Sequence, residues 1–351
     1  MPNLVPTPDA LPVPWIWFQV LLTVTWVIHI LLMNMLLGGA LLSVIGGAKR
    51  SGPGAVVARD AAGKVPTLVA LTVNAGVAPL LFVQVLFGHF FYSSSIVMAN
   101  WWFAVIPLLI VGYYAAYGVA MKYDSGLRPL WAGVTVLVLL FVGLMWTTNN
   151  LLALTPDRWS VWFARPGGSV LGLDEATVWP RWLHMILGGV AVGGLFFALL
   201  QDNRLRRGEQ DAEAARDWAL RFYIHGTIAA MLVGLWWLMA LPEPVMKLFM
   251  GGSVPASIVL VAGIGLGVYA LVMGFLKKVR LAAGLTVATV LAMAVLREIV
   301  RGGYLAGVFK PADLAVTPQV SPMILFLVVF VVGIGCVTYM LKLAARAGKE
   351  A

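Results

Sequence analysis

The sequence has 351 residues, of which 61% are hydrophobic and only 11% are charged. Soluble domains carry about a quarter charged residues, so most of this surface must face something other than water. The composition therefore excludes a soluble enzyme and predicts an all-α polytopic membrane protein. The net charge of +9 does not indicate a nucleic-acid partner, because the basic residues lie in short loops instead of forming one face. A single cysteine, Cys336, excludes disulfides, cysteine-ligated zinc, iron–sulfur clusters and covalently attached haem.

Nine apolar runs are long enough to cross a bilayer, which takes about 20 residues per helix. Open sheet edges cannot face lipid, so each run is predicted to be a helix. The predicted helices are residues 15–46, 66–93, 99–121, 129–153, 178–200, 218–241, 254–276, 279–300 and 321–344.

The loops between these helices differ in basic residues, which predicts the orientation of the chain. Most lysines and arginines follow the first, third, fifth, seventh and ninth helices. The opposite side holds the smaller set, Arg158, Arg165, Arg181, Lys247, Arg297, Arg301 and Lys310. Basic loops favour the cytoplasmic side, so we expect the N-terminus outside and the C-terminus inside.

The loop at 154–177 is the longest on the predicted outer side. It divides the chain into a first four-helix bundle, 1–153, and a second bundle plus a ninth helix, 178–351. Its Trp and Phe residues stand among polar ones, so we expect it to lie on the outer membrane surface.

A faint internal repeat supports this division. His29 and His184 are each followed nine residues later by a glycine pair, which begins at Gly38 and Gly193. Four helices per unit would leave the two copies parallel. Glycine pairs are common in membrane helices, so the repeat alone is a weak signal.

All four histidines of the chain fall inside apolar runs: His29, His89, His184 and His225. A single intramembrane histidine is explained as well by a hydrogen bond between helices. Four of them favour binding of b-type haem, because imidazole is an axial ligand of haem iron and a helix bundle can enclose the macrocycle. We predict two or more haem b groups, with these four residues as candidate ligands.

Depth in the membrane separates the four candidates. His184 lies about six residues, or roughly 9 Å, from the outer end of its helix. His29 and His89 are also nearer the outer side, whereas His225 is nearer the cytoplasm, so His184 and His225 are not expected to share one iron. Met246 and Met250 are the alternative candidates for a thioether ligand opposite His184, although most methionines fill cores.

Glu298 is the acidic residue that falls plainly within an apolar run. The simpler interpretation is an ion pair with Arg301, three residues on. The alternative is an oxygen ligand or proton relay beside an outer haem, which makes Glu298 a candidate catalytic residue and metal ligand. Arg181, one turn before His184, is either a haem propionate partner or an ordinary boundary residue, and Arg301 is likewise a cofactor-binding candidate.

Five stretches, in this order, resemble subunit I of the cytochrome bd-type quinol oxidases. They are WFQVLLTVTWVIHILLMNMLLGGALL, VNAGVAPLLFVQVLFGHFFYSS, MWTTNNLLALTP, WPRWLHMILGGVAVGG and VLREIVRGGYL. The resemblance covers most of the chain and implies nine helices with the N-terminus outside. By position it implies that His29 is the axial ligand of a high-spin b haem, that Glu298 belongs to the same centre, and that His184 binds a low-spin b haem. His89 and His225 have no counterpart in the family.

Three features depart from this family. The segment SIVLVAGIGLGVY has no methionine where the family has its second low-spin ligand. The segment PEPVMKLFMGGS replaces a long quinol-binding loop, and NWWFAVIPLLIVGYYAAYG lacks the glutamates of the third helix. The last two losses argue against a standard enzyme that oxidises quinol and reduces oxygen.

The sequence therefore favours a b-type haem cytochrome subunit of a respiratory complex in the bacterial cytoplasmic (inner) membrane. It would pass electrons between a quinone or another membrane subunit and a c-type cytochrome outside. One alternative is a divergent terminal reductase of oxygen or a related small molecule, at His29 and Glu298. The other is a haem-free membrane anchor or transporter.

Overall fold

The computed structural model describes residues 4–209 and 212–350. Within this part of the chain, nine helices are long and apolar enough to cross a membrane. They are α1 (Trp15–Gly46), α2 (Pro53–Val97), α3 (Ala99–Met121), α4 (Arg128–Leu154), α6 (Val178–Leu205), α7 (Ala212–Ala240), α9 (Val254–Phe275), α10 (Val279–Tyr304) and α11 (Val320–Glu350). The predicted all-α membrane fold is confirmed, and each predicted run overlaps one of these helices.

The largest difference from the prediction is the start of α2, at Pro53 instead of residue 66. The added turns are amphipathic, with one buried face and Arg59 and Gly63 on the other. The buried face consists of Val57, Ala58, Ala61, Ala62 and Val65. Hydropathy detects only the lipid-crossing part of a helix, so this extension is visible in the spacing of its buried residues and not in an apolar run.

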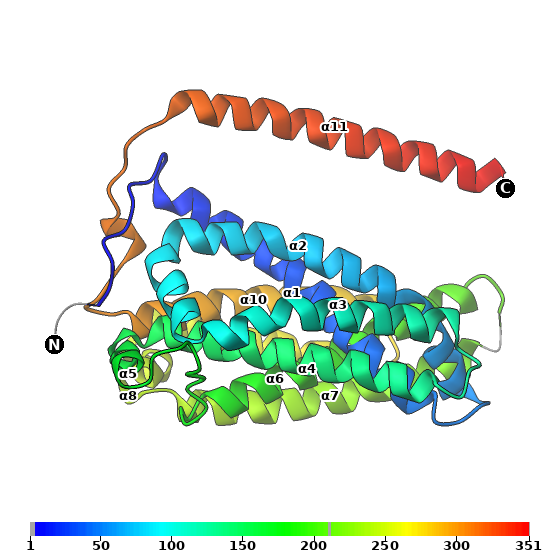
Figure 1. Ribbon diagram of the computed structural model, residues 1–351. Coiled ribbons are helices and arrows are strands. Elements are labelled where there is room, and N and C mark those ends of the chain that lie inside the picture. The colour runs from blue at the N-terminus through cyan, green and yellow to red at the C-terminus, as the bar shows by residue number, and fades with distance from the viewer. Residues whose placement is uncertain (1–3, 210–211, 351) are drawn as a thin grey trace.

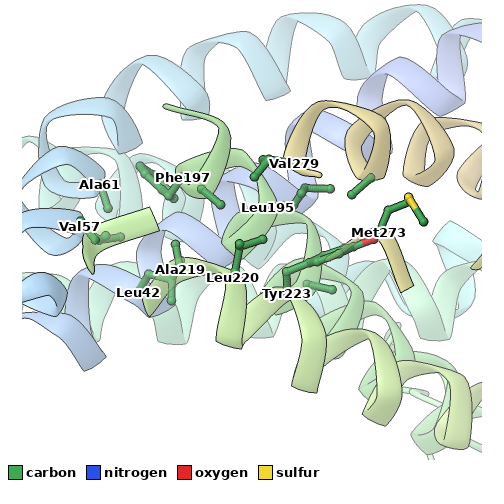
Figure 2. Packing of buried hydrophobic residues seen from close by; sticks show 14 residues of the cluster. Leu42, Val57, Ala61, Leu195, Phe197, Ala219, Leu220, Tyr223, Met273 and Val279 are labelled. Carbon is green, nitrogen blue, oxygen red and sulfur yellow. The ribbon is translucent and has the colours of Figure 1, made fainter. Parts of the chain in front are cut away.

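The extension of α2 packs into a core that both halves of the chain share. Figure 2 shows Val57 and Ala61 of α2 and Leu42 of α1 with side chains from α6, α7 and the neighbouring helices. Phe197 and Tyr223 are among the largest fully buried side chains of the protein's described part, and Leu220 beside them is also buried. The two sequence halves are therefore joined by a common apolar core.

Helices α1 and α6 cross at the two repeated glycines. A Cβ atom on Gly38 would lie 2.7 Å from the Cα of Gly193, and nothing but glycine fits at such a backbone approach. The two positions are equivalent in the internal repeat, so α1 and α6 meet as matching elements. Each then packs against its successor, α1 against α2 and α6 against α7.

The ends of the bundle differ, as Figure 1 shows. One end carries the starts of α1 and α6, the end of α10 and the short helices α5 (Val161–Ala164) and α8 (Glu243–Lys247). We call it the outer end, after the predicted orientation, and the opposite end the inner end. The loop 154–177 folds over the outer helix ends, where Trp159 is buried and its indole N–H donates to the carbonyl of Leu152 at 2.8 Å.

Helix α11 lies apart from the other eight spanning helices (Figure 1). The segment before it is fixed at the outer end, because the Leu11 N–H donates to Ala315 O and the Thr317 N–H to Leu11 O, both at 2.8 Å. The described side chains along α11 are exposed. Its apolar surface is suited to lipid or to another membrane helix.

Candidate functional site

Two of the four histidines are held in the same way by neighbouring helices. Nδ1 of His29 on α1 bonds to the carbonyl of Thr72 on α2 at 3.1 Å. Nδ1 of His184 on α6 bonds to the carbonyl of Ala230 on α7 at 2.9 Å. A carbonyl oxygen only accepts, so each Nδ1 carries a proton, and in the neutral imidazole Nε2 then keeps its lone pair. Metal-bound histidines are typically oriented by such a bond from the other ring nitrogen.

A glycine lies against each of these rings, four residues after the accepting carbonyl. A Cβ on Gly76 would lie 2.8 Å from Cε1 of His29. A Cβ on Gly234 would lie 3.2 Å from Cε1 of His184. The absence of a side chain lets each imidazole lie flat on the neighbouring helix. The carbonyl and the glycine thus recur in both halves of the repeat.

Replacing Gly76 by alanine is expected to push the His29 ring away and break its bond to Thr72. Loss of such an orienting contact lowers metal affinity about 10–100-fold, so a cofactor held by His29 would be bound more weakly by the same factor. The measurement is cofactor content per purified chain. The control is Gly63→Ala on the same helix, where no atom lies within 4 Å of the new Cβ. That variant should keep its cofactor and gain about 0.5–1 kcal/mol of stability. Equal cofactor content in both variants would contradict the assigned role of Gly76.

A set of charged side chains lies one helical turn toward the outer end from both histidines. Glu298 on α10 accepts from Nη1 of Arg297 at 2.8 Å and from Nη1 of Arg301 at 2.7 Å. The exposed fractions of these three side chains are only 17%, 22% and 6% respectively. The predicted Glu298–Arg301 ion pair is therefore present, and Arg297 joins it. We call Arg181, Arg297, Arg301 and Glu298 the arginine cluster.

The aromatic partners of the cluster connect it to both histidines. The Arg297 guanidinium lies 4.8 Å from the ring centroid of Trp26, one turn before His29. The Arg181 guanidinium lies 5.0 Å from the ring of Trp237, which is 5.9 Å from the ring of His184. Cation–π contacts of this kind stabilise guanidinium groups that are removed from water. The cluster thus adjoins both histidine sites through Trp26 and Trp237.

The cluster holds more positive than negative charge. Its three guanidinium groups are close enough to repel one another. Besides Glu298, the nearby carboxylate is Glu175, which is bonded to the backbone N–H and hydroxyl of Thr177, both at 2.6 Å. Arg181 donates to Asn150 Oδ1 at 3.0 Å, but its buried Nε has no partner among the described residues. Buried cations need a counter-charge, so this arrangement suits an anionic ligand.

The other two histidines occupy different surroundings. His89 packs against Phe90 and Phe309, with ring centroids 4.3 and 4.6 Å away, and no described group bonds to its buried Nε2. His225 is exposed on α7, and its Nδ1 bonds to the carbonyl of Arg221 on its own helix at 2.7 Å. The structure thus brings His29 and His184 to one cluster and leaves His225 on the helix surface. His89 borders the cluster through Phe309 and Phe87, because the Phe87 ring lies 4.4 Å from the Arg301 guanidinium.

The methionine alternatives also separate. Met246 is partly buried in the apolar cluster that contains Trp237, whereas Met250 is 56% exposed. In the part of the chain that is described, no three His, Cys, Asp or Glu side chains form a group. The sequence did not single out Arg297, which was counted only among the basic residues of the outer side, or the carbonyl–glycine pairs. A backbone carbonyl leaves no signal in a sequence. Once the partner helices are known, a glycine on each of them, Gly76 or Gly234, shows that the accepting carbonyl lies four residues earlier.

Comparison with known proteins supports the fold. No protein-family model and no curated protein matches the sequence. Among solved structures, the chain is similar to the bd oxidase from Geobacillus thermodenitrificans, with a TM-score of 0.71 and 14% sequence identity. The match covers 95% of this chain and 98% of that chain. The ordered helical motifs had predicted this likeness, and the chain has a bd oxidase-like fold.

Proposed function

We propose that this protein is a b-type haem cytochrome subunit of a respiratory electron-transfer complex. The observation that carries the proposal is the matched pair His29 and His184, each with Nδ1 on a backbone carbonyl and Nε2 free. The bd oxidase-like fold supports a respiratory oxidoreductase in a bacterial inner membrane. The apolar helices make the chain a multi-pass membrane protein.

The residues around the two histidines fit haem. Nε2 of His29 and Nε2 of His184 would bind iron, and the carbonyls of Thr72 and Ala230 would fix the ring planes. The excess positive charge of the arginine cluster would offset the propionates, in which Arg181 would use its free Nε. A bound haem supplies one-electron redox chemistry at its iron. His89 stays a further candidate ligand, because its Nε2 is buried without a described partner.

Glu298 favours electron transfer over reduction of a small molecule. Both of its carboxylate oxygens are held by arginines, so the group serves first as a counter-charge. In this proposal electrons pass between a quinone or another membrane subunit and a c-type cytochrome on the outer side. The position of both histidines toward the outer half of the bundle suits an acceptor or donor outside. A divergent terminal reductase is the competing function, with Glu298 as a ligand or proton relay.

Visible spectra of the purified chain test both functions. We expect a reduced-minus-oxidised spectrum of b-type haem. The electron-transfer function further predicts no change when carbon monoxide is added to the reduced protein, which requires a second ligand on each iron besides His29 or His184. Carbon monoxide needs an open iron position, so a shifted spectrum would favour the terminal reductase. A chain that folds and is expressed without any haem signal would contradict both functions and favour a haem-free anchor or transporter.

A further inference from the structure

A cavity of about 310 Å³ opens at the inner end of the bundle, where α1 turns into α2. Its wall includes three arginines and one carboxylate: Arg50, Arg59, Arg204 and Asp60. Ser51 adds a hydroxyl and Val56 an apolar surface that is 43% exposed. The cavity is at the opposite end of the molecule from the arginine cluster, and the proposed function makes no use of it.

The one carboxylate of this wall is already neutralised. Asp60 accepts two bonds from Arg204, at 2.7 and 2.8 Å, and one from Gln201 at 2.6 Å. It is therefore not available to balance Arg50 or Arg59. The wall keeps a net positive charge that an anion would neutralise.

The other two arginines are accessible. Arg59 pairs with Asp124 at 2.8 Å, but the two side chains are 63% and 78% exposed, and exposed pairs are weak. Arg50 has no hydrogen-bond or ion-pair partner in the described chain. Arg59 and Arg128 also lie against one ring, that of Tyr123, at 4.5 and 4.8 Å from its centroid. The positive surface thus extends beyond the cavity.

We propose that this cavity binds the phosphate headgroup of an anionic phospholipid. Basic pockets between the ends of membrane helices recognise such headgroups, in which guanidinium groups donate to phosphate oxygens. Ala55 and Val56 in the wall, the latter 43% exposed, offer an apolar surface to acyl chains. This apolar border distinguishes a lipid from a free phosphate ion, which would not use it.

Native mass spectrometry of the full chain in detergent, titrated with phosphatidylglycerol, tests the site. The variant Arg50→Gln with Arg59→Gln should bind the first phosphatidylglycerol about tenfold or more weakly than the original chain. The control variant, Arg165→Gln with Lys310→Gln, removes the same charge from exposed positions at the outer end and should bind as the original does. Phosphatidylcholine should bind the original chain more weakly than phosphatidylglycerol.

Three results would overturn the proposal. The inner-end variant could bind phosphatidylglycerol as tightly as the original chain, or the original chain could bind both lipids equally. Millimolar inorganic phosphate could also displace the lipid, which would identify the ligand as the free ion. Haem content is measured on the same samples and should be equal in all of them. The experiment therefore tests lipid binding independently of the proposed haem function.

Discussion

Replacing His184 by alanine should remove about one haem from each chain, and His29→Ala should do the same at the other site. The physical reason is that each imidazole supplies the iron-binding Nε2, while the carbonyl of Ala230 or Thr72 cannot replace it. The variant with both substitutions should lose both haems. The measurement is haem per purified chain together with the reduced-minus-oxidised spectrum.

His225→Ala is the matched control within the same membrane domain. Its ring is exposed and bonds to its own helix, so we expect this variant to keep the haem content of the original chain. His89→Ala measures whether the buried Nε2 of His89 also binds iron. Unchanged haem in the His184→Ala variant, or loss of haem in the His225→Ala variant, would contradict the assignment.

Replacing Glu298 by glutamine should lower the free energy of unfolding by about 3–5 kcal/mol. The substitution keeps the shape of the side chain and removes its charge. Arg297 and Arg301, both largely buried, would then lack the carboxylate that holds them. Reduction of a nearby haem adds an electron to a more positive site, so the haem reduction potential should also rise. Unfolding in mixed micelles and a redox titration measure the two effects.

Glu243→Gln provides the control for Glu298. Glu243 forms an ion pair with Lys247 at 2.5 Å, and the two side chains are 70% and 67% exposed. Exposed pairs contribute about 1 kcal/mol or less, so this variant should unfold almost as the original does, with an unchanged potential. An equal loss of stability in the two variants would show that the buried position of Glu298 has no special role.

The helices could be predicted because the bilayer imposes a simple rule. A span needs an uninterrupted apolar run, and the starts at Trp15, Ala99, Val178 and Val254 follow from that rule to within a residue. The rule does not apply to the first turns of α2, which lie beyond the apolar run and are stabilised by packing of Val57 and Ala61 on α6 and α7.

The candidate site was predicted in its residue types and only partly in its arrangement. The four histidines, Glu298 and Arg181 stand out in the sequence because polar groups are costly in hydrocarbon. The sequence could not show that the Arg297 side chain points to Glu298. A basic residue near the end of a membrane helix can also extend to the membrane surface, and the two cases have the same sequence pattern. Nor could it separate the exposed His225 from the partly buried His29, since helical position alone does not identify the neighbouring helix.

By itself the sequence determined that this chain crosses a membrane, where its helices lie and which polar side chains enter the bilayer. Those properties depend on transfer of single residues from water to lipid, which is local in the chain. Only the tertiary structure decided which imidazoles have a fixed proton and a free lone pair, and where positive charge accumulates. Those properties depend on contacts between α1 and α2, α6 and α7, and α10, which come together when the helices pack.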